Sequence, residues 1–357
     1  MSRAADWLRS WDSQGLHRTG TDGDEAGAAW LAQEAASLGA SVSSETFTLD
    51  RVDPVDCYVE VDGGRTDGVP VFDAPPTGSE GISGTIGTDI GVVQLSPHAV
   101  YSGEYRTLRR SASYRALVIV CHGTQPGLGL LNAEQFREPY GAPAIHVTEP
   151  VRGRVARVVA HYRRTPASAR NILIHLAGAD PTRPPLVVMT PRSSWWQSTA
   201  ERGGGLVCWL ECLRALLAEP PACDVVMTAN SGHELGHLGL DEFLAHRPGW
   251  ERTAIWIHWG ANIGAAAGEL TVMSADDELR AMATSELSDV AHAFAPKMKV
   301  PSGETRDIHR AGGRYLTLVG SNPLFHLPQD RWPHAVDVAA IERIASAAAR
   351  MVVRLTR

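Results

Sequence analysis

From about residue 170 onward, short runs of apolar residues alternate with longer segments of helical periodicity. Wholly apolar runs of about four to eight residues are typical of strands buried on both faces of a sheet. The predicted strands are NILIHLAG (171–178), PLVVMT (185–190), DVVMTAN (224–230), TAIWIHW (253–259), YLTLV (315–319) and PLFHL (323–327). The predicted helices cover 204–218, 274–294 and 339–355. This alternation predicts an α/β fold with a mostly parallel central sheet covered by helices on both faces.

The first half of the chain has a different pattern. A predicted helix over 22–38 stops before Gly39, and a predicted strand follows over 41–49. Residues 52–168 are rich in Gly and Pro, and their short β-like runs are GVVQL (91–95), ALVIVCH (116–122) and PAIHV (143–147). We therefore expect an α/β domain of residues 1–51 plus 169–357, with a smaller β-rich domain of residues 52–168 inserted into it.

Charge and composition exclude several classes of protein. The formal net charge is -7, no basic run exists, and the only lysines are Lys297 and Lys299, so we expect no nucleic-acid partner. No apolar stretch has the length of a signal peptide core or a membrane span. The five cysteines form no C-x-x-C pair, which argues against a disulfide framework. These features predict a cytoplasmic protein without a membrane partner, and they do not indicate an oligomeric state.

Polar residues follow the predicted strands at the points where the strands end. Because parallel strands present their carboxyl ends at one edge of a sheet, these residues are expected to meet there. They are Arg192, Trp195 and Trp196, then Glu201 and Arg202, then His233 and Glu234, then Asn262, and last His326 and Asp330.

His233 to His237 match the pattern H-E-x-x-H. That pattern holds zinc when a helix puts both histidines on one face. Here it directly follows a predicted strand, and Gly232, Gly236 and Gly239 disfavour a helix. A helical zinc-protease site is therefore not expected.

Three segments, in their order and spacing, resemble the zinc aminopeptidases related to glutaminyl cyclases and glutamate carboxypeptidase II. They are HRTGTDGDEAGAAWLAQEAASLGA (17–40), SGHELGHLGLDEF (231–243) and HLPQDRWPHAVDVAAIE (326–342). The resemblance covers nearly all of the chain. It implies an aminopeptidase-like fold and identifies 52–168 with the protease-associated domain that many members carry as an insert.

The resemblance also implies site residues. Glu201 falls at the position of the carboxylate that bridges two zincs, Glu234 at a ligand glutamate, and His326 at the last ligand histidine. His233 falls at the position of the general base. Glu201, Glu234 and His326 could together hold one zinc with an open position.

The remaining ligand positions do not match the family. They fall on Pro191, Ser193 and on Ala261 or Asn262, so at most one zinc is expected. Arg192 and Arg202 could instead balance the two glutamates with no metal, because a buried charge needs a partner.

Other residues keep two interpretations each. Trp195 and Trp196 are a substrate platform or ordinary packing. Arg192 binds a substrate carboxylate or pairs with Glu201. Asp330 orients His326 or caps its loop. His258 lines the pocket or is a core histidine, and the histidines expected only in the core are His122, His146 and His175.

The favoured hypothesis is a hydrolase or acyl-transfer enzyme that acts on an amide bond of a small peptide or amino-acid conjugate. At most one zinc would polarise the carbonyl, and His233 would relay the proton. The alternative is a metal-free relative that binds a ligand or partner through the altered site. A third hypothesis is a metal-free enzyme that uses His233 and Glu234 as an acid–base pair.

Overall fold

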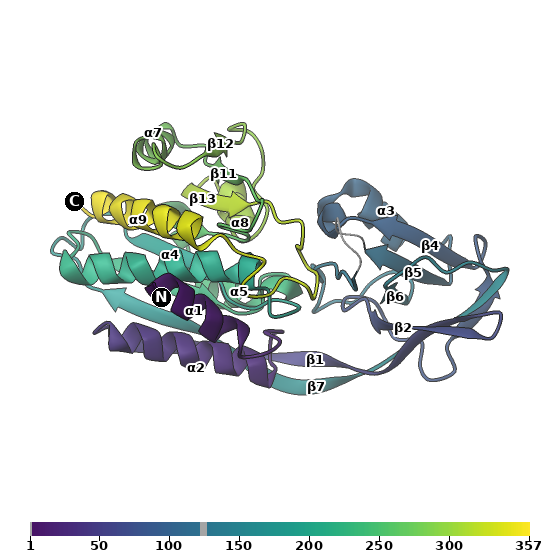
Figure 1. Ribbon diagram of the computed structural model, residues 1–357. Helices are drawn as coiled ribbons and strands as arrows, with labels where there is room; N and C mark the ends of the chain where they lie inside the picture. The colour runs from purple at the N-terminus through teal and green to yellow at the C-terminus, as the bar shows by residue number, and fades with distance from the viewer. Residues whose placement is uncertain (1, 122–126) are drawn as a thin grey trace.

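The computed structural model describes residues 2–121 and 127–357, which form two lobes (Figure 1). Both ends of the described chain lie in the larger lobe. Two long antiparallel strands, β1 (Val42–Val61) and β7 (Val155–Leu176), run from the larger lobe into the smaller one. They stay paired through residues 52 and 168, where we placed the domain boundaries, with one shift of register between Pro54 and Asp56. His122 lies outside the described residues.

The sheet of the larger lobe has the strand order β12-β11-β13-β10-β8-β9-β7-β1. Its central strands β13, β10, β8 and β9 are parallel, while β7 and β11 run antiparallel to their neighbours β9 and β13. The strands are β8 (Leu186–Pro191), β9 (Val225–Asn230), β10 (Ile255–Trp259), β11 (Leu270–Met273), β12 (His292–Phe294) and β13 (Arg314–Gly320). This architecture confirms the predicted α/β sheet with a parallel centre.

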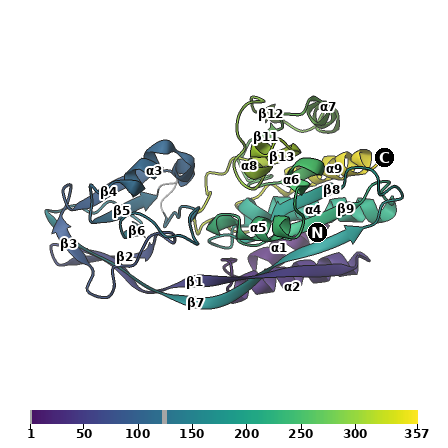
Figure 2. The ribbon, with the colours of Figure 1, turned by 180° about the vertical axis from the view of Figure 1, so that it is seen from behind.

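Alternate side chains of these strands enter two different cores, because successive side chains of a strand point to opposite faces. Val188 packs in one core and Met189 in the other. The first face is covered by α1 (Arg3–Asp12), α2 (Asp22–Ser37), α4 (Thr199–Ala218), α7 (Asp277–Glu286) and α9 (Val338–Leu355). The second face is covered by α5 (Leu238–Ala245), α6 (Trp250–Thr253) and α8 (Thr305–Arg310) (Figure 2). Burial of both faces explains why the strands are apolar throughout.

The start of α4 lies unusually close to the turn after β10. A Cβ atom at Gly204 would stand 1.8 Å from the carbonyl oxygen of Ile263, so only glycine fits there. The amide of Asn262 donates a hydrogen bond of 3.0 Å to the carbonyl of Glu201. This close packing fixes Glu201 at the edge of the sheet.

Two predicted elements are wrong. Residues 323–327 form turns rather than a strand, because Pro323 has no N–H to donate and His326 adopts a left-handed φ of 62°. The helix predicted over 274–294 spans only α7, since the chain turns after Glu286 and pairs β12 with β11. The pattern also gave no sign of α1, α8 or β11.

The smaller lobe extends the ladder through β2 (Gly64–Pro70), β6 (Ala144–Val147), β5 (Ala116–Cys121) and β4 (Ile90–Leu95), while β3 (Ile82–Thr85) pairs with β7. One face carries the 3-10 helix η1 (Pro97–Tyr101) and α3 (Gly103–Arg110). Within 2–121 and 127–357, no helix combines the length and the apolar character needed to cross a bilayer.

Candidate functional site

The H-E-x-x-H segment forms a tight turn after β9 rather than a helix. His233–Leu235 is a single 3-10 turn (η2), and α5 begins only at Leu238. Gly232, Gly236 and His237 have left-handed φ values of 81°, 79° and 67°. The turn nevertheless brings the two histidine rings together, with centroids 5.3 Å apart. Backbone bending thus achieves the proximity that a helix would give by periodicity.

Glu304, just before α8, completes a buried cluster with these histidines. Its Oε1 lies 2.8 Å from Nδ1 of His233, and its Oε2 lies 3.3 Å from Nε2 of His258 on β10. One ligand atom each from His233, His237 and Glu304 lie within 4.8 Å of one another, and this is the one such group of three in the part of the chain that the structure describes. Two imidazoles and a carboxylate are a usual ligand set of catalytic zinc.

The electrostatics leave Glu304 as a buried anion among imidazoles. Burial opposes its ionisation, but His233 and the neighbouring His258 and His237 hold its pKa well below the usual range. Burial, with the nearby charge of Arg202, lowers the pKa of His233 to about 4, so His233 is neutral at pH 7. Nε2 of His237, Nε2 of His258 and Oε2 of Glu304 are buried without a hydrogen-bond partner among the described residues. Buried polar atoms of this kind usually have a partner such as an ion or water.

Glu201 belongs to a second, neighbouring group. Its Oε1 lies 2.7 Å from Nη2 of Arg202 and 3.5 Å from Nε2 of His326. Burial alone would raise the pKa of Glu201, but Arg202 and His326 lower it to about 2. The charge of Glu201 is therefore balanced by an arginine.

Glu234 is held by neutral groups instead. It accepts hydrogen bonds from the Ser193 hydroxyl (2.6 Å) and the Thr19 amide (2.7 Å), and burial raises its pKa. The predicted ligands Glu201, Glu234 and His326 do not form a group within metal-binding distance among the described residues. Glu201 lies against Arg202 and His326, whereas Glu234 lies against Ser193 and Thr19.

Arg192 and Asp330 take structural roles. Arg192 pairs with Asp24 of α2 at 2.8 Å and not with Glu201. Asp330 accepts hydrogen bonds from the amides of Ala200 and Glu201 (2.6 and 3.0 Å), which caps the first turn of α4. Burial raises the pKa of Asp330 to about 7.

His326 is oriented from the smaller lobe. Its Nδ1 lies 2.7 Å from the carbonyl oxygen of Leu130. Because a carbonyl only accepts, Nδ1 carries a hydrogen, and Nε2 faces Oε1 of Glu201 at 3.5 Å. Asp330, which we considered as the residue that orients His326, instead accepts hydrogen bonds from the amides at the start of α4.

The two tryptophans differ. Trp195 is buried against Phe72 of the smaller lobe, with ring centroids 4.5 Å apart, and donates to Asn132, so its role is packing between the lobes. Trp196 is half-buried and donates to the carbonyl of His326 at 2.9 Å.

Asn262 has a left-handed φ of 64° and forms hydrogen bonds with Asn322 and Gly320, so it shapes the turn after β10.

The sequence did not reveal Glu304 or the contribution of His237. Glu304 stands in the polar loop PSGETRD, where a glutamate is normally exposed, and no apolar periodicity signals its burial. His237 belongs to the H-E-x-x-H segment, whose glycines disfavour the helix that such a pair of zinc ligands needs. Its pairing with His233 through a bent turn has no simple spacing rule.

No model of a protein family matches the sequence, and no curated protein sequence is similar to it. Solved structures do resemble it. A zinc aminopeptidase from Bacillus subtilis superposes with a TM-score of 0.79 at 15% identity, covering 99% of this chain and 94% of that one. A peptidase M28 precursor from Shewanella amazonensis SB2B gives 0.78 at 14% identity, covering 100% and 93%. An aminopeptidase from Aneurinibacillus sp. strain AM-1 gives 0.74 at 14% identity, covering 99% and 94%. The chain therefore has the fold of the zinc aminopeptidases over its whole described length.

Proposed function

We propose that the chain is a metal-dependent amide hydrolase whose single divalent ion is held by His233, His237 and Glu304. One observation carries the proposal. Glu304 is a fully buried carboxylate, and the basic side chains within 4.0 Å of it, among the described residues, are the imidazoles of His233 and His258 rather than an arginine or a lysine. A buried charge requires compensation, and a divalent ion provides it.

The other two buried glutamates argue for this location. Glu201 has Arg202 as its cation, and Glu234 has hydrogen-bond donors that also suit its protonated form. Glu304 has neither an arginine nor a lysine partner within 4.0 Å among the described side chains. Of the three, it is the carboxylate best suited to a metal.

His237 is placed to act as a ligand. Its Nε2 has no hydrogen-bond partner among the described residues, while its Nδ1 faces Asp307 Oδ2 at 3.7 Å and Arg306 Nη2 at 3.5 Å. A metal at Nε2 would leave the ring hydrogen on Nδ1, on the side of the Asp307 carboxylate, and metal-binding histidines usually present their second nitrogen to a carboxylate. In this arrangement His233 is a ligand rather than the proton relay that the sequence suggested.

A bound divalent ion would stabilise the negative charge that develops on an amide oxygen during hydrolysis. The neighbouring residues would supply the rest. The carbonyl of Leu130 holds the ring of His326 through Nδ1, so that its Nε2, beside Glu201, would exchange a proton with the substrate. Arg202 keeps Glu201 ionised beside His326. The substrate would be a small peptide or an amino-acid conjugate.

A metal-free enzyme is the second candidate. The 2.8 Å contact between His233 and Glu304 favours it, since a carboxylate that orients a histidine is a common acid–base pair. In this candidate Glu304 takes the place of Glu234, which the sequence suggested as the partner of His233. Glu234 lies against Ser193 and Thr19 instead.

Hydrolysis of the dipeptide Ala-Ala, measured before and after exhaustive chelation, distinguishes the two. The metal-dependent proposal predicts that turnover disappears on chelation, returns with added zinc, and is absent in His237→Ala. Turnover that survives chelation would favour the metal-free pair. No turnover in any state, with a correctly folded protein, would refute both.

A further inference from the structure

A cleft of about 640 Å³ lies between the two lobes. Its wall on the smaller lobe is formed by η1 and α3, which contribute His98, Tyr101 and Arg106. Its wall on the larger lobe is formed by the loop 299–302, by α8, and by residues of β11 and the end of β13. The cleft is large enough for a small ligand.

The cleft is strongly cationic. The described residues that line it include four cations, Arg106, Lys299, Arg306 and Arg310, and no carboxylate. Two of these cations are already balanced, since Arg306 pairs with Glu134 and Arg310 lies 3.5 Å from Asp307. Arg106 donates only to the carbonyl of Tyr101 (3.4 Å), and Lys299 has no carboxylate within 4.0 Å among the described residues. A chain of net charge -7 thus concentrates uncompensated positive charge at one cleft.

The cleft adjoins the candidate metal cluster at one place and His326 at another. Ser302 lines it, and the next residues along the loop are Gly303 and Glu304. On the opposite wall, the ring of His98 stacks on Phe325 at 5.0 Å, and Phe325 stacks on His326 at 3.9 Å. A ligand in the cleft would therefore lie beside the groups to which we assign the chemistry.

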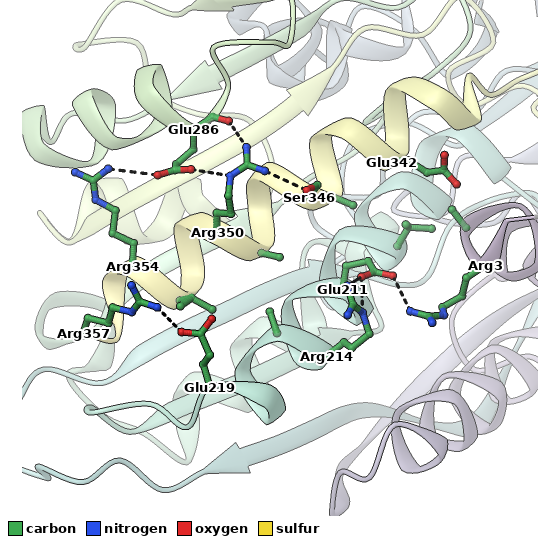
Figure 3. A pocket seen from close by; sticks show the side chains of 16 residues that line it. Arg3, Glu211, Arg214, Glu219, Glu286, Glu342, Ser346, Arg350, Arg354 and Arg357 are labelled. Carbon is green, nitrogen blue, oxygen red and sulfur yellow. Dashed lines mark hydrogen bonds and ion pairs between the residues drawn. The ribbon is translucent and has the colours of Figure 1, made fainter.

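In a second pocket, on the larger lobe, the arginines are paired with carboxylates (Figure 3). It lies between α4 and α9 and is also rich in arginine, but its arginines pair with carboxylates in the same hollow. Arg350 and Arg354 bind Glu286, and Arg214 binds Glu211. That hollow presents no uncompensated charge of one sign, in contrast to the cleft between the lobes.

We propose that the cleft between the lobes binds a carboxylate of the substrate, through Lys299 and Arg106. The inference rests on the proposed amide hydrolase and narrows its substrate class to short peptides or acylated amino acids with a free acidic group at the end that lies in this cleft. Lysine and arginine both bind carboxylates by charge-assisted hydrogen bonds.

The test compares binding of Ala-Ala with binding of Ala-Ala amide, by calorimetry on the full chain after chelation. The two probes differ only in the carboxylate. We expect the acid to bind the wild type at least about tenfold more tightly than the amide. Lys299→Ala should abolish this preference, and Lys299→Arg should keep it.

Lys297→Ala is the matched control. Lys297 is the other lysine of the chain, is exposed, pairs with Asp277 and does not line the cleft. It should leave the preference unchanged. Because both lysines are exposed, neither substitution threatens the fold.

Equal affinity for the two probes, absence of binding by both, or a preference that survives Lys299→Ala would overturn the inference. Displacement of the acid by inorganic phosphate at much lower concentration would assign the cleft to phosphate and overturn it as well. The measurement needs neither metal nor turnover. If the protein prefers Ala-Ala over Ala-Ala amide but binds no metal, only the proposed hydrolase is refuted. If it hydrolyses Ala-Ala and Ala-Ala amide at equal rates, only the carboxylate site is refuted.

Discussion

Oε1 of Glu304 lies 2.8 Å from Nδ1 of His233, which joins the loop before α8 to the turn after β9. The contact is fully enclosed, since Glu304 is 0% and His233 is 5% exposed. The resemblance predicts a catalytic role for His233, whereas it assigns no role to the segment that contains Glu304. The candidate metal site therefore depends on a residue that only the fold brings into place.

Gly303 tests the role of this loop. Its φ is 78°, and a Cβ there would stand 3.6 Å from Cε1 of His258 and 3.7 Å from Cε1 of His233. Gly303→Ala fits sterically but strains the backbone, so we expect a loss of about 1 kcal/mol of unfolding free energy. Because relief of this strain would move Glu304, we also expect weaker zinc binding by calorimetry.

Gly312→Ala is the control for Gly303. Gly312 has the same φ of 78°, and a Cβ there would meet no atom within 4 Å. It should cost similar stability and leave zinc affinity unchanged. Equal zinc affinity in Gly303→Ala and Gly312→Ala would show that the loop containing Gly303 does not position a metal ligand.

Arg202 tests the ion pair inside the site. Arg202→Leu leaves Glu201 buried without its cation, which should cost about 3–5 kcal/mol in chemical denaturation at pH 7. Arg214→Leu on the same helix removes an exposed pair with Glu211 and should cost less than about 1 kcal/mol. Similar losses in the two variants would show that Glu201 does not depend on Arg202.

Asp12 gives a pH-dependent prediction away from the site. Its carboxylate accepts hydrogen bonds from Arg331, Thr199 and the amide of Trp332, which hold its pKa below the ordinary value of 3.8 despite partial burial. A lowered pKa in the folded state stabilises the protein above the ordinary value, and this contribution disappears as the pH falls through the folded-state pKa.

Asp12→Asn should therefore lower the unfolding free energy at pH 7 by about 1–2 kcal/mol, a modest figure because Arg331 is half-exposed. The difference from the wild type should shrink below pH 3.8. Denaturation curves at several pH values measure it, and a difference that stays constant with pH would contradict the assignment.

Trp195 tests the contact between the lobes. It is 2% exposed and packs with Phe72 and Leu130, and Leu130 also orients His326. Trp195→Ala should cost about 3–5 kcal/mol and loosen residues 128–136. Faster amide hydrogen exchange confined to that segment would support this, and unchanged exchange would contradict it.

The sequence predicted the central strands β8, β9, β10 and β13 and the long helices α2, α4 and α9, because their apolar residues recur at the period of each element. It also left open that Arg202 balances Glu201, and the structure contains that pair. It could not predict that Leu130 orients His326, because the contact is made by a backbone carbonyl that has no side-chain signature. The burial of Glu304 could not be predicted for a related reason, since a lone glutamate in a polar segment carries no sign of burial.

The metal content of the purified chain, measured by plasma mass spectrometry before and after zinc is added, tests the central claim most directly. We predict about one ion per chain in the wild type and in Glu234→Gln, and almost none in Glu304→Gln. Thermal denaturation would confirm that both variants are folded. A wild type that takes up no zinc, or loss of the ion in Glu234→Gln with retention in Glu304→Gln, would contradict the assignment of the metal to His233, His237 and Glu304.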